Sequence, residues 1–101
     1  MAFQRWGYEF DGAYTSANNL QSDGGVYVIW DRYADNKWSV LDVGKAIDVR
    51  ARTMNHDRGQ QWKSCAQGEI RFTAAYIRDE ATRVAVEKQI RNLVNPPCGD
   101  R

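Results

Sequence analysis

Two side chains suited to binding phosphate lie four residues apart in the middle of this chain. Arg52 and His56 fall in a segment with apolar residues at i, i+4 and i+7, namely Ile47, Ala51 and Met54. That spacing predicts a helix with one buried face. Arg52 and His56 lie away from this face, so we expect them to project together into solvent or a cleft. A guanidinium binds two phosphate oxygens at once, and a histidine assists proton transfer, so the pair favours an anion site.

A carboxylate further along the chain is the candidate metal ligand. Glu87 lies in a second predicted helix. The apolar stripe beside it consists of Val86, Ile90, Leu93 and Val94. One carboxylate together with a substrate phosphate can hold Mg²⁺. The alternative is an ordinary helix pair between Glu87 and Arg83 or Arg91, which lie four residues to either side.

The elements that must position these residues follow from hydrophobic patterning. Residues 26–30 and 38–43 are β-branched and aromatic runs joined by a polar loop, which predicts a β-hairpin that stops at Gly44. Residues 69–77 alternate as a third strand, and a helix is expected from Asp79 to about Val94, where Asn95-Pro96-Pro97 ends it.

Turn signals define the remaining segments. Residues 3–10 are expected to form a short strand or extended arm, and residues 59–68, which begin with a helix-stopping Gly59, a loop. The predicted order is β-β-α-β-α, an α+β domain over residues 1–101 with a small antiparallel three-stranded sheet, flanking helices and an N-terminal extension.

Five features of residues 24–99 resemble the GIY-YIG nuclease family. Gly25-Val26-Tyr27 and Asp42-Val43-Gly44 are similar to its paired tripeptides. Arg52 follows Gly44 by eight residues and His56 by twelve, and Glu87 lies on the later helix, as in the family. The resemblance implies the same three-stranded fold and a metal-dependent endonuclease.

The same resemblance assigns a role to each of the matching residues. Tyr27 would activate water, Arg52 would hold the phosphate, His56 would assist, and Glu87 would bind Mg²⁺ or Mn²⁺. A phenol with a pKa near 10 is a poor base at neutral pH, and the cations Arg52 and Lys45 together with the metal would lower that pKa. For Arg52 the alternative is a surface ion pair with Asp48.

Two positions depart from the family pattern. Asp42 stands where the family has tyrosine, and Cys98-Gly99-Asp100 stands where an asparagine is usual. Asp42 is interpreted as a lesion that repels phosphate, as a second metal carboxylate, or as a solvent-facing residue at the strand end. Side-chain alternation predicts Val40 and Asp42 on one face of the strand and Leu41 and Val43 on the other.

The charges and aromatic residues indicate a nucleic-acid partner only locally. The net charge is +1, but basic residues concentrate between positions 45 and 63 and predict a basic patch or, alternatively, a solvated helix face of mixed charge. The candidates for nucleic-acid contact are Lys45, Arg50, Arg58 and Lys63. The N-terminal aromatics are Phe3, Trp6, Tyr8 and Phe10; they could stack on bases, but packing across the sheet is the expected role.

The partners and setting follow from the same reasoning. DNA is favoured over RNA as the substrate, with a protein partner or a homodimer supplying specificity. A catalytically silent domain of this fold that binds nucleic acid or protein is the alternative function. Cys65 and Cys98 are expected to be reduced thiols, and the absence of a signal-like apolar segment predicts a cytoplasmic setting.

Overall fold

The computed structural model describes residues 2–56 and 59–98. The strands in this part of the chain are β1 (Ala2–Arg5), β2 (Tyr8–Tyr14), β3 (Gly25–Tyr33), β4 (Lys37–Ala46) and β5 (Glu69–Tyr76). The helices are η1 (Ala17–Asn19, a 3₁₀ turn), α1 (Val49–Met54), α2 (Gly59–Cys65) and α3 (Glu80–Val94). Every strand pairing is antiparallel, in the order β1-β2-β5-β3-β4.

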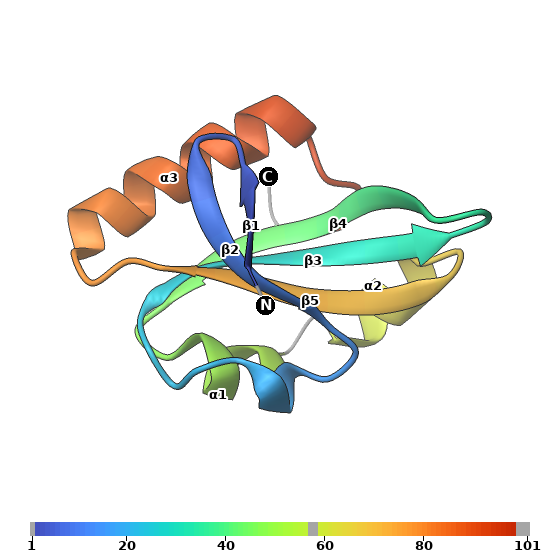
Figure 1. The fold of residues 1–101 in the computed structure, drawn as a ribbon, viewed down its shortest axis with the longest axis horizontal. Helices are drawn as coiled ribbons and strands as arrows, with labels where there is room; N and C mark the ends of the chain where they lie inside the picture. Colours follow the sequence, from blue (N-terminus) through green and yellow to red (C-terminus); the bar gives the residue numbers. More distant parts are fainter. Residues whose placement is uncertain (1, 57–58, 99–101) are drawn as a thin grey trace.

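The sheet separates two hydrophobic clusters. In Figure 1, α3 lies on one side of the sheet, and α1 and α2 lie on the other. The α3 side is filled by Val26, Val28, Trp30, Val43, Val86 and Ile90, among others. The other side is filled by Leu20, Tyr27, Ile29, Leu41, Val49 and Trp62, among others. Alternate residues of β3 therefore belong to different clusters, as the period of a strand buried on both faces requires.

The α+β class is confirmed, but the predicted three-stranded sheet is wrong. The expected strands are β3, β4 and β5, and two more come from the segment predicted as one arm. The chain reverses there at Trp6 and Gly7, whose φ angles are +52° and +85°. Two successive residues with positive φ make the tight turn that joins hairpin strands. Arg5 is therefore paired with Tyr8, and β2 adds to the sheet beside β5.

The predictions for the later helical segments differ in outcome. The helix expected from Asp79 is confirmed as α3, whose N-cap Asp79 accepts from the Thr82 backbone N–H at 2.8 Å, and which ends at Asn95 in the left-handed region. Its stripe is buried at Val86 and Ile90, whereas Leu93 is 61% exposed. The loop predicted at residues 59–68 is wrong in its first part, because residues 59–65 form α2.

The first helix exposes the face that was predicted to be buried. Asp48 caps α1 by accepting from the Ala51 N–H at 3.0 Å, and the buried residues of α1 are Val49 and Thr53. Ile47, one residue before this cap, is 81% exposed, and Met54 is 52% exposed. The hydrogen bonds from the Ala51 N–H and the Ser22 hydroxyl hold the pKa of the Asp48 carboxyl below its usual value. Asp48 therefore serves the start of α1 as a capping carboxylate.

The C-terminal segment is tied back onto the sheet. Cys98 is fully buried, its N–H donates to the Leu41 carbonyl of edge strand β4 at 3.0 Å, and its sulfur forms a disulfide with Cys65 at the end of α2. The prediction of reduced thiols is therefore wrong. A sequence separation of 33 residues gives no sign of the pairing, because only the fold brings α2 and the C-terminal segment together.

Candidate active site

Two of the predicted site residues meet under the sheet. Tyr27 points from β3 towards α1 and α2, and its hydroxyl lies 2.6 Å from His56 Nε2. Both side chains are buried, with 1% of Tyr27 and 9% of His56 exposed. The indole of Trp62 covers the imidazole at a centroid distance of 4.6 Å. The pair is therefore a hydrogen-bonded phenol and imidazole enclosed by aromatic rings, an arrangement that allows a proton to move between them.

The glycine of the second tripeptide makes room for this phenol. Gly44 is paired with Tyr27 across β3 and β4, and a Cβ at position 44 would lie 2.1 Å from the Tyr27 hydroxyl oxygen. Glycine thus admits the ring and does not turn the chain, because β4 continues to Ala46. Gly25 allows close approach of the backbone of β5, since a Cβ at position 25 would lie 2.2 Å from the Ala75 carbonyl oxygen.

Asp42 is a buried structural carboxylate. Its side chain is fully buried, so the solvent-facing interpretation is wrong. One carboxylate oxygen accepts from the Val43 N–H at 2.8 Å and from Arg91 Nη2 at 2.9 Å, and the other accepts from Trp62 Nε1 at 2.8 Å. These donors occupy the carboxylate, so Asp42 does not fit the role of a second metal ligand.

A β-bulge explains why alternation misplaced the neighbours of Asp42. Ile29 is paired with Asp42 but the next residue of β3, Trp30, is paired with Val40, so Leu41 is the extra residue. Leu41 consequently belongs to the α1 and α2 cluster, and Val43 to the α3 cluster. The prediction that both share one face is wrong, because a bulge shifts the period of two by one residue.

Glu87 is linked to this site around the edge of the sheet. Its carboxylate lies 3.6 Å from Arg91 Nε, which is the predicted alternative pairing, and Arg91 continues to Asp42. Trp62 then connects Asp42 to the His56 ring. α3, which carries Glu87, and α1, which carries Arg52, cover opposite faces of the sheet (Figure 1), so the structure does not bring these two candidate residues together in one cleft.

The basic residues lie around α1 and α2. Arg52 is exposed and lines a shallow depression with Lys45 and Asn55, whereas His56 is buried, so the expectation that Arg52 and His56 project together is wrong. Arg50 is half-buried on α1, and Lys63 is exposed on α2. Arg58 and Gly99 lie outside the described residues, so their predicted roles have no structural counterpart here. The depression places two cations, Arg52 and Lys45, on one surface beside the carboxylate of Asp48.

A metal ion at this site would need ligands from the substrate as well as from the protein. The described residues contain no group of three or more His, Cys, Asp or Glu side chains placed to hold an ion. With Asp42 occupied, Glu87 is the predicted ligand that remains, and its side chain is 23% exposed. One carboxylate and a substrate phosphate fit Mg²⁺ or Mn²⁺, whereas a cage built from protein ligands alone does not fit.

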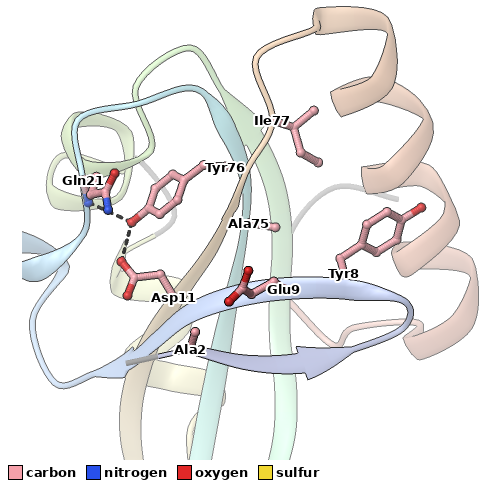
Figure 2. Close-up of a pocket in the computed structure, with 8 residues that line it drawn as sticks. All are labelled: Ala2, Tyr8, Glu9, Asp11, Gln21, Ala75, Tyr76 and Ile77. Atoms are coloured by element: carbon pink, nitrogen blue, oxygen red, sulfur yellow. Dashed lines mark hydrogen bonds between the residues drawn. The ribbon is translucent and has the colours of Figure 1, made fainter.

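A third group of polar side chains is structural. Figure 2 shows Asp11 beside Tyr76 at one end of a hollow between β2, β5 and the segment after η1. Asp11 accepts from the Tyr76 hydroxyl at 2.6 Å and from the Tyr14 hydroxyl at 2.5 Å, and the Gln21 N–H donates to Tyr76 at 2.9 Å. Burial and the bond to Asp11 raise the pKa of Tyr76 far above 10, so this phenol stays neutral and offers no nucleophile.

Sequence reasoning missed two residues that organise the candidate site. Trp62 was assigned to a loop, although Trp62, Cys65 and Ala66 have the spacing of a helix face. Arg91 was considered only as a partner of Glu87, and its contact with Asp42 spans 49 residues.

Comparisons with protein-family models, curated proteins and solved structures give no significant match for this chain. The geometry of the site therefore carries the functional argument. No helix in the described residues is long and apolar enough to cross a membrane.

Proposed function

We propose that this chain is a GIY-YIG-like endonuclease that hydrolyses a nucleic-acid phosphodiester bond with Mg²⁺ or Mn²⁺. The observation that carries the proposal is the 2.6 Å contact between Tyr27 and His56, together with the glycine at position 44 that admits the phenol. The two side chains are 29 residues apart in sequence, and the resemblance assigns both to one site, so their meeting supports the resemblance.

The roles follow from the chemistry of each group. His56 Nε2 accepts the proton of Tyr27, and the resulting phenolate takes a proton from the attacking water. Arg52 binds the phosphate and stabilises the charge that develops on its oxygens. Glu87 would hold the divalent ion, which supplies further charge stabilisation when bound. Because Arg91 already contacts Glu87, metal binding competes with this ion pair.

The alternative is a catalytically silent domain that binds nucleic acid or protein. One observation favours it: only 1% of Tyr27 is exposed, so a water molecule has little access to the phenol as it stands. The presence of Asp42 where the family has tyrosine also favours the silent domain. Asp42 accepts hydrogen bonds from Trp62 and Arg91 at strand β4 and so has a structural role there. Such a domain would keep the basic surface of α1 without hydrolysing the bound strand.

The setting and partners are also proposals. DNA is the preferred substrate, and a protein partner or a second copy would supply specificity. A cytoplasmic location was predicted from the N-terminal sequence. The Cys65–Cys98 disulfide favours an oxidising compartment instead, because disulfides seldom persist in reducing cytosol.

Plasmid nicking tests the proposal. Purified protein is incubated with supercoiled DNA in Mg²⁺, in Mn²⁺ and in EDTA, beside Tyr27→Phe, Arg52→Lys and Glu87→Ala. The matched control is Glu80→Ala, an exposed carboxylate on the same helix. Metal-dependent nicking that all three variants lose and the control keeps is the expected result. Nicking that survives Tyr27→Phe contradicts the mechanism, and a wild type that binds DNA without nicking it establishes the silent domain.

A further inference from the structure

Three tryptophans gather on the α3 side of the sheet, beyond the part that the valines and α3 fill. Trp6 stacks on Trp30 with a centroid distance of 5.7 Å and an interplanar angle of 7°. Trp38 meets Trp30 edge-on at 6.2 Å. The three indoles come from the β1–β2 turn, from β3 and from β4. Trp38 is 39% exposed, which is unusual for so large an apolar side chain.

Two arginines lie over these rings. The Arg5 guanidinium is 5.2 Å from the Trp6 ring and 5.9 Å from Trp30, and that of Arg71 is 5.9 Å from Trp38. In the part of the chain that the structure describes, Arg5 has no carboxylate partner. Arg71 has a 3.5 Å contact with Glu69 through one nitrogen, but its Nε is buried without a hydrogen-bond partner among the described residues. The surface therefore carries positive charge that its own side chains do not balance.

Two hollows open on this surface and share one wall. Arg5, Trp30 and Trp38 line both. One, of about 460 Å³, is completed by Phe3 and the backbone of β2, and the other, of about 340 Å³, by Trp6, Val94 and Pro97. Both volumes fall in the range of ligand pockets, which is roughly 300–1,000 Å³. Because Arg5 belongs to the shared wall, the two hollows are neighbours with a guanidinium between them.

We propose that this aromatic surface, formed by Arg5, Trp6, Trp30, Trp38 and Arg71, binds single-stranded nucleic acid. Successive bases would occupy the two hollows against indole rings, and Arg5 would meet the phosphate between them. Aromatic platforms with interleaved arginines bind single strands in this way and tolerate many sequences, because every base has a π face. A duplex does not bind here, because its bases are stacked on one another. The unbalanced Arg5 charge selects an anionic strand over a neutral glycan or a proline-rich peptide.

The surface lies on the opposite face of the sheet from the Tyr27–His56 pair and on the same face as α3, which carries Glu87. Trp30 belongs to the cluster under α3, whereas Tyr27 belongs to the cluster on the opposite face. Binding at the aromatic surface therefore does not depend on the nuclease proposal. It requires no metal, so it is measured in EDTA, where the proposed cleavage cannot occur.

Fluorescence anisotropy provides the test. The probe is fluorescein-labelled oligothymidylate of about 12 nucleotides, within the site sizes of single-strand binders, and the comparison is a duplex of equal length. The test variants are Trp38→Ala, Trp38→Phe and Arg5→Ala. The matched controls are Val84→Ala, an exposed apolar residue on α3, and Arg78→Ala, an exposed arginine before that helix. Near-UV circular dichroism checks that each variant is folded.

The expected pattern separates stacking from charge. Trp38→Ala weakens binding of the single strand by about tenfold, since one base loses its platform, and Trp38→Phe recovers part of the loss. Arg5→Ala lowers the dependence of log Kd on log salt concentration by about 0.7, the share of one phosphate in a single strand. Val84→Ala and Arg78→Ala bind like the wild type.

Three results would each overturn the assignment. They are equal affinity for the duplex, binding that folded Trp38→Ala retains in full, and preferential binding of a proline-rich peptide or an oligosaccharide that Trp38→Ala abolishes. A protein that does not nick plasmid can still bind the single strand in the anisotropy assay. Failure of the nuclease proposal is therefore distinguishable from failure of the single-strand binding proposal.

Discussion

Replacing Gly44 by alanine is the sharpest test of how the site is built. The added methyl would lie 2.1 Å from the Tyr27 hydroxyl oxygen and 2.2 Å from the ring carbon that bears it. The ring cannot swing into solvent, because Tyr27 is 1% exposed and is flanked by His56 and Trp62. We therefore expect the phenol to be displaced and its 2.6 Å bond to His56 to be lost.

The magnitude follows from two costs. Overfilling a close-packed core costs about 1–3 kcal/mol, and losing a buried hydrogen bond adds about 0.5–1.5 kcal/mol. Gly44→Ala should therefore lower the free energy of unfolding by about 2–4 kcal/mol. For a domain of this size each kcal/mol corresponds to roughly 4–8 °C in Tm, so the change is large enough to measure without ambiguity.

Urea denaturation followed by tryptophan fluorescence is the assay, with Gly59→Ala as the control. A methyl added at position 59 would meet no described atom within 4 Å, and Gly59 has no positive φ. Alanine there should be neutral or stabilising by up to about 1 kcal/mol. In a Tyr27→Val background, which removes the ring, Gly44→Ala should cost much less. A free energy of unfolding for Gly44→Ala within about 0.5 kcal/mol of the wild type, the range of ordinary surface changes, would refute the reasoning.

Three further outcomes are expected. Arg91→Met removes the guanidinium from the buried Asp42 carboxylate and should destabilise the fold by about 3 kcal/mol; Asp42→Asn in that background should recover part of the loss in urea denaturation, and no recovery would contradict an electrostatic cause. Reduction of the Cys65–Cys98 disulfide should cost about 3–4 kcal/mol from its 33-residue separation, whereas a Cys65→Ser/Cys98→Ser variant should be insensitive to reductant; equal stability of oxidised and reduced protein would exclude the contribution. The raised pKa of Tyr76 means that its neutral form stabilises the fold below pH 10 and that this contribution is lost as the pH rises above 10 towards the folded pKa; absorbance at alkaline pH should show a late-titrating tyrosine that Tyr76→Phe removes, and an unchanged titration would argue against it.

The parts of the fold that were predictable depend on local signals. β3 and β5 are runs of β-branched and aromatic residues, and α3 has a capping aspartate, an apolar stripe and a terminating Asn-Pro-Pro. Each signal lies within the element it specifies. Local patterning was therefore sufficient for the β3–β4 hairpin, for β5 and for α3.

The errors arose where the structure depends on one unusual backbone position or on a distant partner. The β1–β2 turn uses Trp6 with a positive φ, a residue that turn preferences do not favour there. The bulge at Leu41 moved a whole side-chain face without any glycine to mark it. The disulfide joins residues that no spacing rule pairs. In α1, the cap at Asp48 sets the start of the helix, and Val49 is buried in place of Ile47.

The candidate site shows the same division. The membership of Tyr27 and His56 in one site was anticipated from the register of the motif, although their direct contact was not. The occupation of Asp42 by Trp62 and Arg91 was not, since these donors come from elements on opposite faces of the sheet. A carboxylate held from both sides of an edge strand has no signature in a linear pattern, because the geometry exists only once both helices are docked.

The tie between Cys98 and β4 has a consequence for how copies of this protein behave together. An outer strand exposes unpaired backbone groups that can recruit another chain. Among the described residues the sheet has two such strands, and β1 is short, with four residues. The longer one, β4, is occupied at Leu41 by the backbone of the chain's own C-terminal segment, which the disulfide anchors. We expect reduction of the disulfide to loosen this cover of β4, so oxidised protein should remain dispersed under conditions in which reduced protein self-associates.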